Sequence, residues 1–477
     1  MKKRRRVRRP LKREIKSTLD RPLQSYHLNF FTLFVAGMAA VAGILFGFDT
    51  GVISGAILFV QKLYHLTPFE NGVVVSASLI GAVIGAISSG WFADRFGRKR
   101  LLLTAAVIFV VGTLGSALAQ SVAHLIISRL ILGFAIGIAS FAAPLYISEI
   151  APPKMRGALV SLNQLAITIG ILTSYFVDVY YAELGEWRWM FGVGVIPAVI
   201  LFLGFLFLPD SPRWLCSVGK THQAFDVLKR IRKTSHIRAE FAAIRASLEA
   251  EGHWKDILKP WLLPAIWIGL GLGFFQQFTG INTVIYYAPT IFQLAGFKSD
   301  VAAIMATMGI GAINVIATIV SLFLIDRWGR KPLLYIGMTI MLICLSTLSI
   351  SFALGTSEVL QWMAFFSMFF YVVGFAISLG PIMWLMFTEI FPLKVRGVAT
   401  SVMASVQWLF NFIVSLTFLT LVHYLQPSGT FGLYALICLL GIWFVHREVP
   451  ETKGVSLEQI ERNLRRGRAG RDLGLLK

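Results

Sequence analysis

The sequence predicts an all-α membrane protein in which twelve transmembrane helices form two equivalent halves of six. Three observations lead to this fold class: an apolar composition, a set of motifs that occurs twice, and an uneven distribution of positive charge. Hydrophobic residues make up 56% of the 477 residues, charged residues only 14%, and the mean hydropathy is +0.72. A soluble chain carries about 25% charged residues, so this composition indicates membrane-spanning segments.

Apolar segments recur along the whole chain, and each is long enough to cross a hydrocarbon core about 30 Å thick as a helix. We predict twelve spans. In chain order they cover approximately residues 30–56, 71–92, 101–120, 122–145, 158–178, 189–208, 261–290, 300–325, 332–353, 361–387, 398–421 and 428–446.

Two motifs, and the weak echo of a third, occur once in each half of the chain and in the same order. The pairs are Asp94–Lys99 with Asp326–Lys331, Ser148–Gly157 with Thr388–Gly397, and Leu208–Arg213 with Val449–Gly454. Repeats of this kind predict two structurally equivalent halves. Parallel halves of six helices are typical of transporters with a binding site between the halves.

The repeats and the spans divide the chain into five parts. These are a basic N-terminal arm (1–29), the first six-helix half (30–208), a cytoplasmic helical linker (209–260), the second six-helix half (261–446) and a cytoplasmic tail (447–477). The linker mixes charge with short apolar periodicity, as at Ala224, Val227, Leu228 and Ile231, and predicts short amphipathic helices. The basic tail after residue 455 is expected to be partly disordered.

The formal net charge of +20 lies at alternate connections between the predicted spans, which argues against a nucleic-acid partner. Lys and Arg crowd into the N-terminal arm, residues 95–100, 154–156, 213–260, 327–331 and 394–396, and the tail, whereas the other loops hold only Lys62, Arg188 and Lys298. Because cytoplasmic loops are rich in Lys and Arg, both termini are expected in the cytoplasm.

The N-terminal arm contains eleven Lys and Arg residues against Glu14 and Asp20. It can bind an anionic lipid surface or serve only to fix topology, and both interpretations stay open. It is not read as a secretory signal peptide, because the apolar stretch that follows is too long and contains Asp49.

The residues that could carry enzymatic or metal chemistry are few and scattered. Cys216, Cys344 and Cys438 have no disulfide or metal spacing, so we interpret them as packing residues. His124 and His423 stand alone at the ends of predicted spans. We therefore expect no enzyme, no metal site and no cofactor.

Asp49 and Arg129 are the two charged residues that we assign to the predicted span interiors. A charge at the bilayer centre costs about 3 kcal/mol or more, so such residues usually face a cavity and pair with each other. One interpretation is a static pair that joins two helices. The other is a proton site, in which burial favours the protonated carboxyl while the nearby guanidinium opposes it.

Uncharged polar residues inside the spans indicate a neutral ligand with many hydroxyl groups. Amides offer donors and acceptors that match hydroxyls, and an indole face suits the C–H face of a sugar ring. Hydrogen bonding between helices is the alternative for each amide taken alone. The residues are Gln164, Gln276, Gln277, Asn282, Asn314, Gln407 and Asn411, together with Trp384, which follows the helix-breaking Pro381.

From about residue 30 to 461 the chain resembles the sugar porter family of the major facilitator superfamily. The residues that carry the match are Gly47–Gly55, the two Asp-Arg-x-Gly-Arg-Lys loops, Pro209–Leu215, Gln276–Asn282, Gly380–Trp384 and Pro450–Gly454. One such loop alone would indicate only the wider superfamily, whereas the combination is specific. Asp210 departs from the family, which usually has Glu there, and we expect little effect.

The resemblance implies alternating access around a central sugar site. It places Phe46 and Tyr287 in the lining of that site, beside the seven amides and Trp384. It also implies a cytoplasmic gate network, in which we expect Glu149 to pair with Arg98 and Glu389 with Arg330. The gate residues are Asp94, Arg95, Arg98, Glu149, Arg156, Asp326, Arg327, Arg330, Glu389 and Arg396.

The family contains proton symporters and uniporters, and two features favour symport. Asp49 and Arg129 match the residues of similar symporters, and Phe375–Ser378 lacks the Glu of many animal uniporters. The leading expectation is therefore proton-driven import of a neutral monosaccharide across the inner membrane of a bacterium. Ile171, which makes one wall apolar, favours a hexose, and a monomer is the default.

Two alternatives remain. One is a facilitative sugar or polyol uniporter in which Asp49 and Arg129 are merely structural. The other, remote, alternative is a membrane sugar sensor, which would require a longer signalling tail than residues 447–477.

Overall fold

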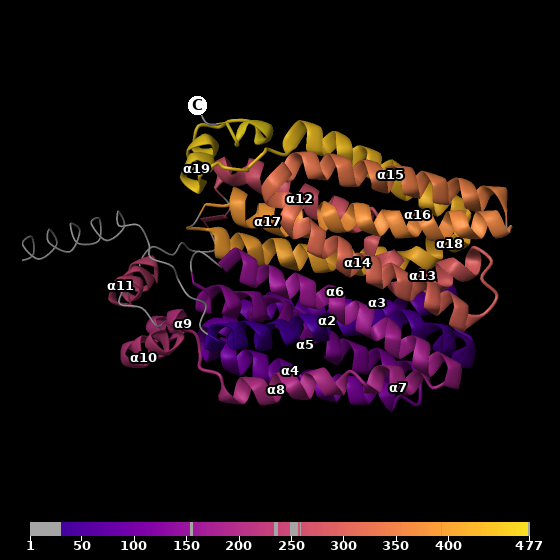
Figure 1. The fold of residues 1–477 in the computed structure, drawn as a ribbon, viewed down its shortest axis with the longest axis horizontal. Coiled ribbons are helices and arrows are strands. Elements are labelled where there is room, and N and C mark those ends of the chain that lie inside the picture. The colour runs from indigo at the N-terminus through magenta and orange to yellow at the C-terminus, as the bar shows by residue number, and fades with distance from the viewer. Residues whose placement is uncertain are drawn as a thin grey trace, which may run out of the picture.

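The computed structural model describes residues 30–152, 156–232, 237–248, 256–257, 259–355, 357–392 and 394–475. The predicted basic arm, residues 1–29, lies outside them. The described residues contain helices and no strand, so the all-α prediction is confirmed. Long helices run side by side along the longest axis, and short helices gather at one end of the bundle (Figure 1).

The first half of the chain forms one layer of the bundle, coloured indigo to magenta in Figure 1. Two short helices, α7 and α8, together replace the single sixth span that the sequence predicted. In order, the helices are α2 (Phe30–Tyr64), α3 (Pro68–Phe96), α4 (Arg98–Ala117), α5 (Val122–Ile150), α6 (Arg156–Leu184), α7 (Trp187–Gly192) and α8 (Val195–Phe207).

The second half forms the other layer, coloured orange to yellow. Its seventh and tenth predicted spans are each divided into two helices. In order, the helices are α12 (Leu263–Phe278), α13 (Ile281–Leu294), α14 (Asp300–Trp328), α15 (Arg330–Leu354), α16 (Glu358–Ile377), α17 (Leu379–Ile390) and α18 (Arg396–Glu448).

Four backbone positions interrupt or bend the described helices of the second half. One is Tyr287, with φ −122° and ψ 15°, which kinks α13 two residues before Pro289. Gly280, with φ 95°, separates α12 from α13, and Ser378, with φ −126° and ψ −99°, separates α16 from α17 just before Pro381. Gln426, with φ 59°, bends α18 beside Pro427. Within the described residues, eleven helical segments are long and apolar enough to span a membrane. The bend at Gln426 divides the last one, which gives the twelve predicted spans.

The repeated Asp-Arg-x-Gly-Arg-Lys loops fold alike in both halves. Gly97 ends α3 and precedes α4 with φ 91°, and Gly329 ends α14 and precedes α15 with φ 93°. Residues other than glycine rarely adopt a positive φ of this size. The glycine of the motif is therefore required by the tight turn, and we call the end of the bundle with these two loops the motif end.

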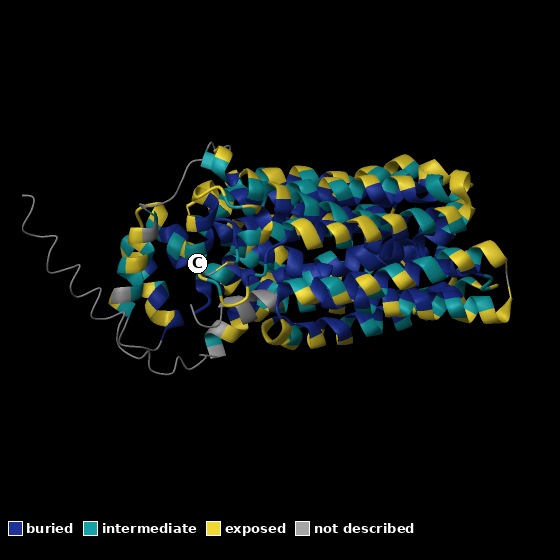
Figure 2. Cartoon of the chain, turned by 90° about the horizontal axis from the view of Figure 1, so that it is seen from above, coloured by how far each residue is buried: buried dark blue, intermediate teal, exposed yellow. Residues whose placement is uncertain are grey.

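Small residues allow close contact between α2 and α6. A Cβ atom at Gly47 would overlap the carbonyl oxygen of Ile167, and one at Gly51 would overlap the hydroxyl of Ser174. Small residues let helix backbones approach closely in lipid, where burial of apolar surface gives no drive. Buried residues run through the middle of the bundle, whereas exposed ones lie mostly on its rim (Figure 2). Exposed side chains such as Phe207 and Phe323 suit contact with lipid.

Short helices lie at the motif end (Figure 1). Within the linker, α9 (Pro212–Ser217), α10 (Thr221–Ile231) and α11 (Ile237–Leu248) confirm the predicted short helices, and η3 (Pro260–Leu262) leads into α12.

The expectation of a partly disordered tail is wrong for its described part, which forms α19 (Leu457–Arg465) and η4 (Gly470–Asp472). Asn463 is fully buried and donates to the carbonyl oxygens of Leu473 and Leu475 at 2.8 and 2.9 Å. Ile460 and Leu464 are buried as well, so an apolar stripe within a basic sequence anchors this segment.

Candidate functional site

Asp49 on α2 and Arg129 on α5 form an ion pair inside the first half. Arg129 Nη1 lies 3.0 Å from Asp49 Oδ1, and the two side chains are only 1% and 4% exposed. Arg129 Nη2 donates to the hydroxyl of Ser78 on α3 at 2.9 Å, and the guanidinium lies 5.7 Å from the centre of the Phe191 ring. Charges so far from water are held by their partners, and a change in either charge must alter the whole contact.

The assignment of two charged residues to the span interiors is incomplete. Asp178, the last residue of the predicted span 158–178, is fully buried where α6 packs against Gly55 of α2, and α6 continues beyond it to Leu184. Its Oδ2 accepts a hydrogen bond of 3.2 Å from the backbone N–H of Gly55 on α2.

Four of the predicted amides form one network around the breaks at Gly280 and Ser378. Gln276 donates to the carbonyl oxygens of Leu379 and Gly380 at 2.9 and 3.2 Å. The oxygen of Gln276 accepts from Gln407 and, at 3.4 Å, from Gln277. Asn282 donates to the oxygen of Gln277 at 2.5 Å. Residues from α12, α13 and α18 therefore present amide groups at one place.

Asn411 on α18 joins a second group of polar residues. Its amide donates to the hydroxyl of Tyr286 at 3.2 Å, and its oxygen accepts from Ser415 at 3.1 Å. Tyr287 is fully buried and donates to the carbonyl oxygen of Ser415 at 2.9 Å. The Tyr287 hydroxyl therefore contacts the backbone of α18.

Tyr286 on α13 is not among the residues that the sequence predicted for the site. Its hydroxyl interacts with that of Thr50 on α2, and it lies within electrostatic range of Asp49 and Arg129. Tyr286 therefore lies between Asn411 of the second half and Thr50 of the first, close to the ion pair. The signal in the sequence is its spacing: Tyr286 follows Asn282 by four residues and shares its helix face.

Other predicted residues lie apart from these networks. Among the described residues no hydrogen bond joins Gln164 or Asn314 to another predicted binding residue. Asn314 is buried, with 8% of its surface exposed. Trp384 is 38% exposed, and its ring lies 5.7 Å from that of Phe387. Phe46 on α2 packs against Trp408 on α18, with ring centres 5.1 Å apart. Phe46 therefore bridges the two halves.

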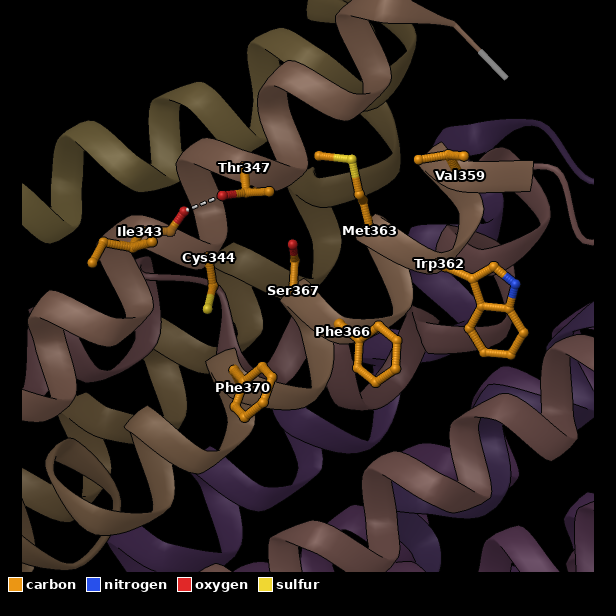
Figure 3. Close-up of a pocket in the computed structure, with 9 residues that line it drawn as sticks. All are labelled: Ile343, Cys344, Thr347, Val359, Trp362, Met363, Phe366, Ser367 and Phe370. Carbon is orange, nitrogen blue, oxygen red and sulfur yellow. Dashed lines mark hydrogen bonds between the residues drawn. The ribbon is translucent and has the colours of Figure 1, made fainter. Parts of the chain in front are cut away.

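An open apolar groove of about 530 Å³ lies between α15 and α16 (Figure 3). None of the predicted binding residues lines it. Trp362 and Phe366 on its wall are at least half exposed, and the hydroxyl of Thr347 donates to Ile343 of its own helix at 2.9 Å. The groove belongs to the lipid-facing surface.

At the motif end, each half contains an ion pair between an arginine of the loop motif and a glutamate. Arg98 contacts Glu149 at 2.9 Å and Asp94 at 3.3 Å. In the second half, Arg330 contacts Glu389 at 2.7 Å, and Asp326 lies 3.8 Å from it. These pairs join helices of the same half, and their part in gating stays a prediction.

A further carboxylate in each half, Asp210 in the first and Glu451 in the second, caps the helix that follows the loop motif. Asp210 accepts from the backbone N–H groups of Arg98 and Lys99 at 3.1 and 3.4 Å. Glu451 accepts from those of Arg330 and Lys331 at 3.2 and 2.9 Å. A negative charge at a helix N-terminus is favourable. Burial raises the pKa of Asp210, and the backbone N–H groups oppose this shift.

The remaining gate residues contact aromatic rings or backbone. Arg95 lies over the rings of Trp91 and Phe96, and the carbonyl of Arg327 accepts from Lys453 at 2.7 Å. Arg396 donates to the carbonyl of Phe391 at 3.3 Å. The side chain of Arg156 is outside those that the structure describes.

The two halves meet at the end opposite the motif end. Lys62 of α2 contacts Asp300 of α14 at 2.5 Å, and Asp300 also accepts from Gln293 at 2.6 Å. The hydroxyl of Tyr175 on α6 donates to the carbonyl of Ile285 on α13 at 3.0 Å. These contacts close the gap between the halves at this end.

The comparisons with known proteins agree over nearly the whole chain. The family model "Sugar (and other) transporter" matches residues 35–464. The galactose-proton symporter of Escherichia coli (strain K12) is 43% identical over 447 residues, which cover 93% of this chain and 96% of that protein. The D-xylose transporter of Levilactobacillus brevis is 43% identical over 439 residues, covering 91% and 96%.

Among solved structures, the xylose transporter XylE from E. coli in a partially occluded inward open conformation matches with a TM-score of 0.80 and 33% identity. The match covers 90% of this chain and 100% of that one. The similarity therefore includes the whole helical bundle and is not restricted to single motifs.

Proposed function

The chain belongs to the sugar porter family of the major facilitator superfamily, and we propose that it imports a neutral monosaccharide together with protons by alternating access. It is a multi-pass membrane transporter and not an enzyme. The observation that carries the proposal is the buried Asp49–Arg129 pair, which lies within reach of the amides of the second half through Tyr286.

Protonation of Asp49 is the proposed coupling step. A neutral carboxyl group holds Arg129 less tightly than a carboxylate does, while Arg129 keeps its bond to Ser78. The helices α2 and α5 can then shift against each other. Because ligands act only through their different affinities for two conformations, the proton and the sugar must both favour the same rearranged state.

We assign sugar binding first to the amides of the Gln276 network, because their polar groups converge from three helices. Gln164, Asn314, Trp384 and Phe46 complete the site in this proposal. Asn411 contributes through Tyr286. The hydroxyl of Tyr287 donates to the backbone of α18, so in this proposal Tyr287 holds α13 against α18 beside the site.

We propose that the motif end faces the cytoplasm, which would place both termini there. The concentration of Lys and Arg at this end supports the orientation. Since the halves touch at the opposite end, the structure corresponds in this proposal to an inward-facing carrier. Similarity to the inward open XylE structure supports the same assignment.

For the substrate we propose a hexose, and we propose that the carrier works as a monomer in a bacterial inner membrane. The galactose-proton symporter matches over 93% of this chain, which supports the choice. The D-xylose transporter matches with the same identity, so pentoses belong in the test.

The test measures alkalinisation of the medium when sugar is added to energy-depleted cells that contain the protein. Glucose, galactose, xylose, arabinose and inositol are compared, with Asp49→Asn beside the wild type. We expect a pH rise with a hexose that disappears in Asp49→Asn while exchange of labelled sugar persists. Sugar entry without a pH change, identical in the variant, would establish a uniporter with a structural ion pair.

A further inference from the structure

Resting on the proposed symport, we infer that Asp178 is a second proton-binding site of this carrier, placed where α6 contacts α2. In the present conformation its carboxyl group is protonated. It releases and binds its proton when the halves separate at the end opposite the motif end. The reaction is transfer of one proton between a carboxylate and external water, so no other reactant is needed.

In the described part of the chain, Asp178 has no positively charged partner that would stabilise an ionised carboxylate. The residue is 0% exposed, and Oδ2 accepts from the backbone N–H of Gly55 at 3.2 Å. Oδ1 is also buried and has no hydrogen-bond partner. In the described part of the chain no ion pair involves Asp178. An ionised carboxylate without a partner is far more costly to bury than a neutral carboxyl group.

Charged groups on the neighbouring helices have other partners. Lys62 is paired with Asp300, Arg129 with Asp49, and Arg188 donates to the carbonyl of Ala119. None of the titratable or charged side chains on the elements packed against this part of α6 bonds to Asp178 in the described chain. They are Asp49, Lys62 and Tyr64 on α2, His124 and Arg129 on α5, Arg188 on α7, Tyr286 and Tyr287 on α13, Asp300 on α14, and Tyr175, Tyr180, Tyr181 and Glu183 on α6 itself.

A contact between the two halves lies one helical turn away from Asp178. Tyr175, three residues before Asp178, donates to Ile285 of the second half at 3.0 Å. A Cβ atom at Gly311 on α14 would lie 2.7 Å from the Tyr175 ring. Alternating access must break these contacts, and water then reaches the helix face next to Asp178. Proton binding at Asp178 is thereby linked to the conformation of the carrier.

The position of Asp178 also suits a route to the first proton site. Gly55 follows Asp49 by six residues on α2, a rise of about 9 Å at 1.5 Å per residue. Under the proposed orientation Asp178 therefore lies between the external solution and Asp49. It can take up a proton from outside before Asp49 does.

The test compares wild type with Asp178→Asn, because an asparagine keeps the shape and the oxygen that accepts from Gly55. Ser174→Ala, one turn earlier on the same face and next to Gly51, is the matched control. Labelled sugar and medium pH are recorded together, and exchange of labelled sugar is measured at several external pH values.

Because Asp178 binds and releases its proton on the same side of the membrane, we expect Asp178→Asn to keep both sugar exchange and the proton-to-sugar ratio within about twofold of wild type. The dependence of exchange on external pH should lose one titration step, and Ser174→Ala should keep the wild-type pH profile. If Asp178→Asn fails to reach the membrane, Asp178→Ser, which also keeps an acceptor oxygen, takes its place. A pH profile equal to wild type would overturn the inference and leave a permanently neutral structural carboxyl. Absence of proton uptake in wild type would instead refute the proposed symport and this inference with it.

Discussion

Arg129 binds Asp49 through Nη1 and Ser78 through Nη2, and this forked contact is the residue-scale basis of the proposed coupling. When Asp49 is neutralised, the bond to Ser78 keeps the guanidinium in place. A lysine offers one compact ammonium group and cannot reproduce a planar fork. The identity of the cation, and not only its charge, should therefore matter.

We predict that Arg129→Lys lowers sugar-induced proton uptake about tenfold or more, because a hydrogen bond to a charged group contributes about 1.5–3 kcal/mol. Alkalinisation and label uptake measured together give the result. Arg188→Lys, whose arginine donates to a backbone carbonyl and lies over Trp187, is the control. An unchanged proton-to-sugar ratio in Arg129→Lys would contradict the assigned role.

The adjacent tyrosines Tyr286 and Tyr287 allow a matched comparison. We predict that Tyr286→Phe weakens apparent sugar affinity and coupling together, since its hydroxyl joins Asn411 to the neighbourhood of Asp49. Tyr287→Phe should mainly lower stability by about 1 kcal/mol, the usual net value of one hydrogen bond. Transport assays and thermal unfolding in detergent separate the two effects. Equal transport defects in both variants would count against the distinction.

Charge in an apolar segment is a strong signal, which is why the sequence alone could select Asp49 and Arg129. Asp178 was not selected with them because the predicted span ended at that residue, whereas α6 extends to Leu184. Tyr286 was not selected from the sequence because tyrosine is common in membrane spans. Its importance depends on a contact between helices that are distant in sequence, and no local pattern contains that contact.

At the scale of elements, the glycines of α2 fix how closely it meets α6. We predict that Gly47→Ala destabilises the protein by about 1–3 kcal/mol, the usual effect of overpacking, because its Cβ would overlap the backbone oxygen of Ile167. Gly37→Ala, in the same helix with no atom within 4 Å of the added Cβ, should leave stability unchanged or improved. Thermal unfolding in detergent compares them, and equal behaviour would refute the close-packing argument.

Helix ends were predictable where local chemistry decides them. Thr67 and Glu70 form a capping box at the start of α3, and Gly280 and Pro381 mark breaks within predicted spans. The long α18 shows the limit of such reasoning, because its two spans join through a bend at Gln426 without a loop. The helical tail was missed because its basic composition outweighed a short apolar stripe that becomes buried only against the bundle.

At the scale of the whole molecule, the repeated motifs correctly indicate that the halves share local structure: each half has an arginine–glutamate pair and a carboxylate that caps the next helix. The same motifs say nothing about which end of the bundle is closed. That depends on contacts between the halves, such as Lys62 with Asp300, which lie outside the repeats. Two arrangements that differ by a few kcal/mol are both compatible with one sequence.

The contact of Lys62 with Asp300 is therefore a point where the balance between conformations can be tested. Lys62 is 64% exposed, and exposed ion pairs contribute about 0.2–1 kcal/mol. We predict that Asp300→Asn raises the population opened at the end opposite the motif end by about two- to fivefold. A cysteine at buried Thr307 on α14, in a background without Cys216, Cys344 and Cys438, reports this opening through its labelling rate with an impermeant thiol reagent. Glu358→Gln, which removes an exposed charge at the start of α16, should not change that rate. Equal labelling in Asp300→Asn and its parent would mean that the apolar contacts around Tyr175 and Gly311 alone hold this end closed.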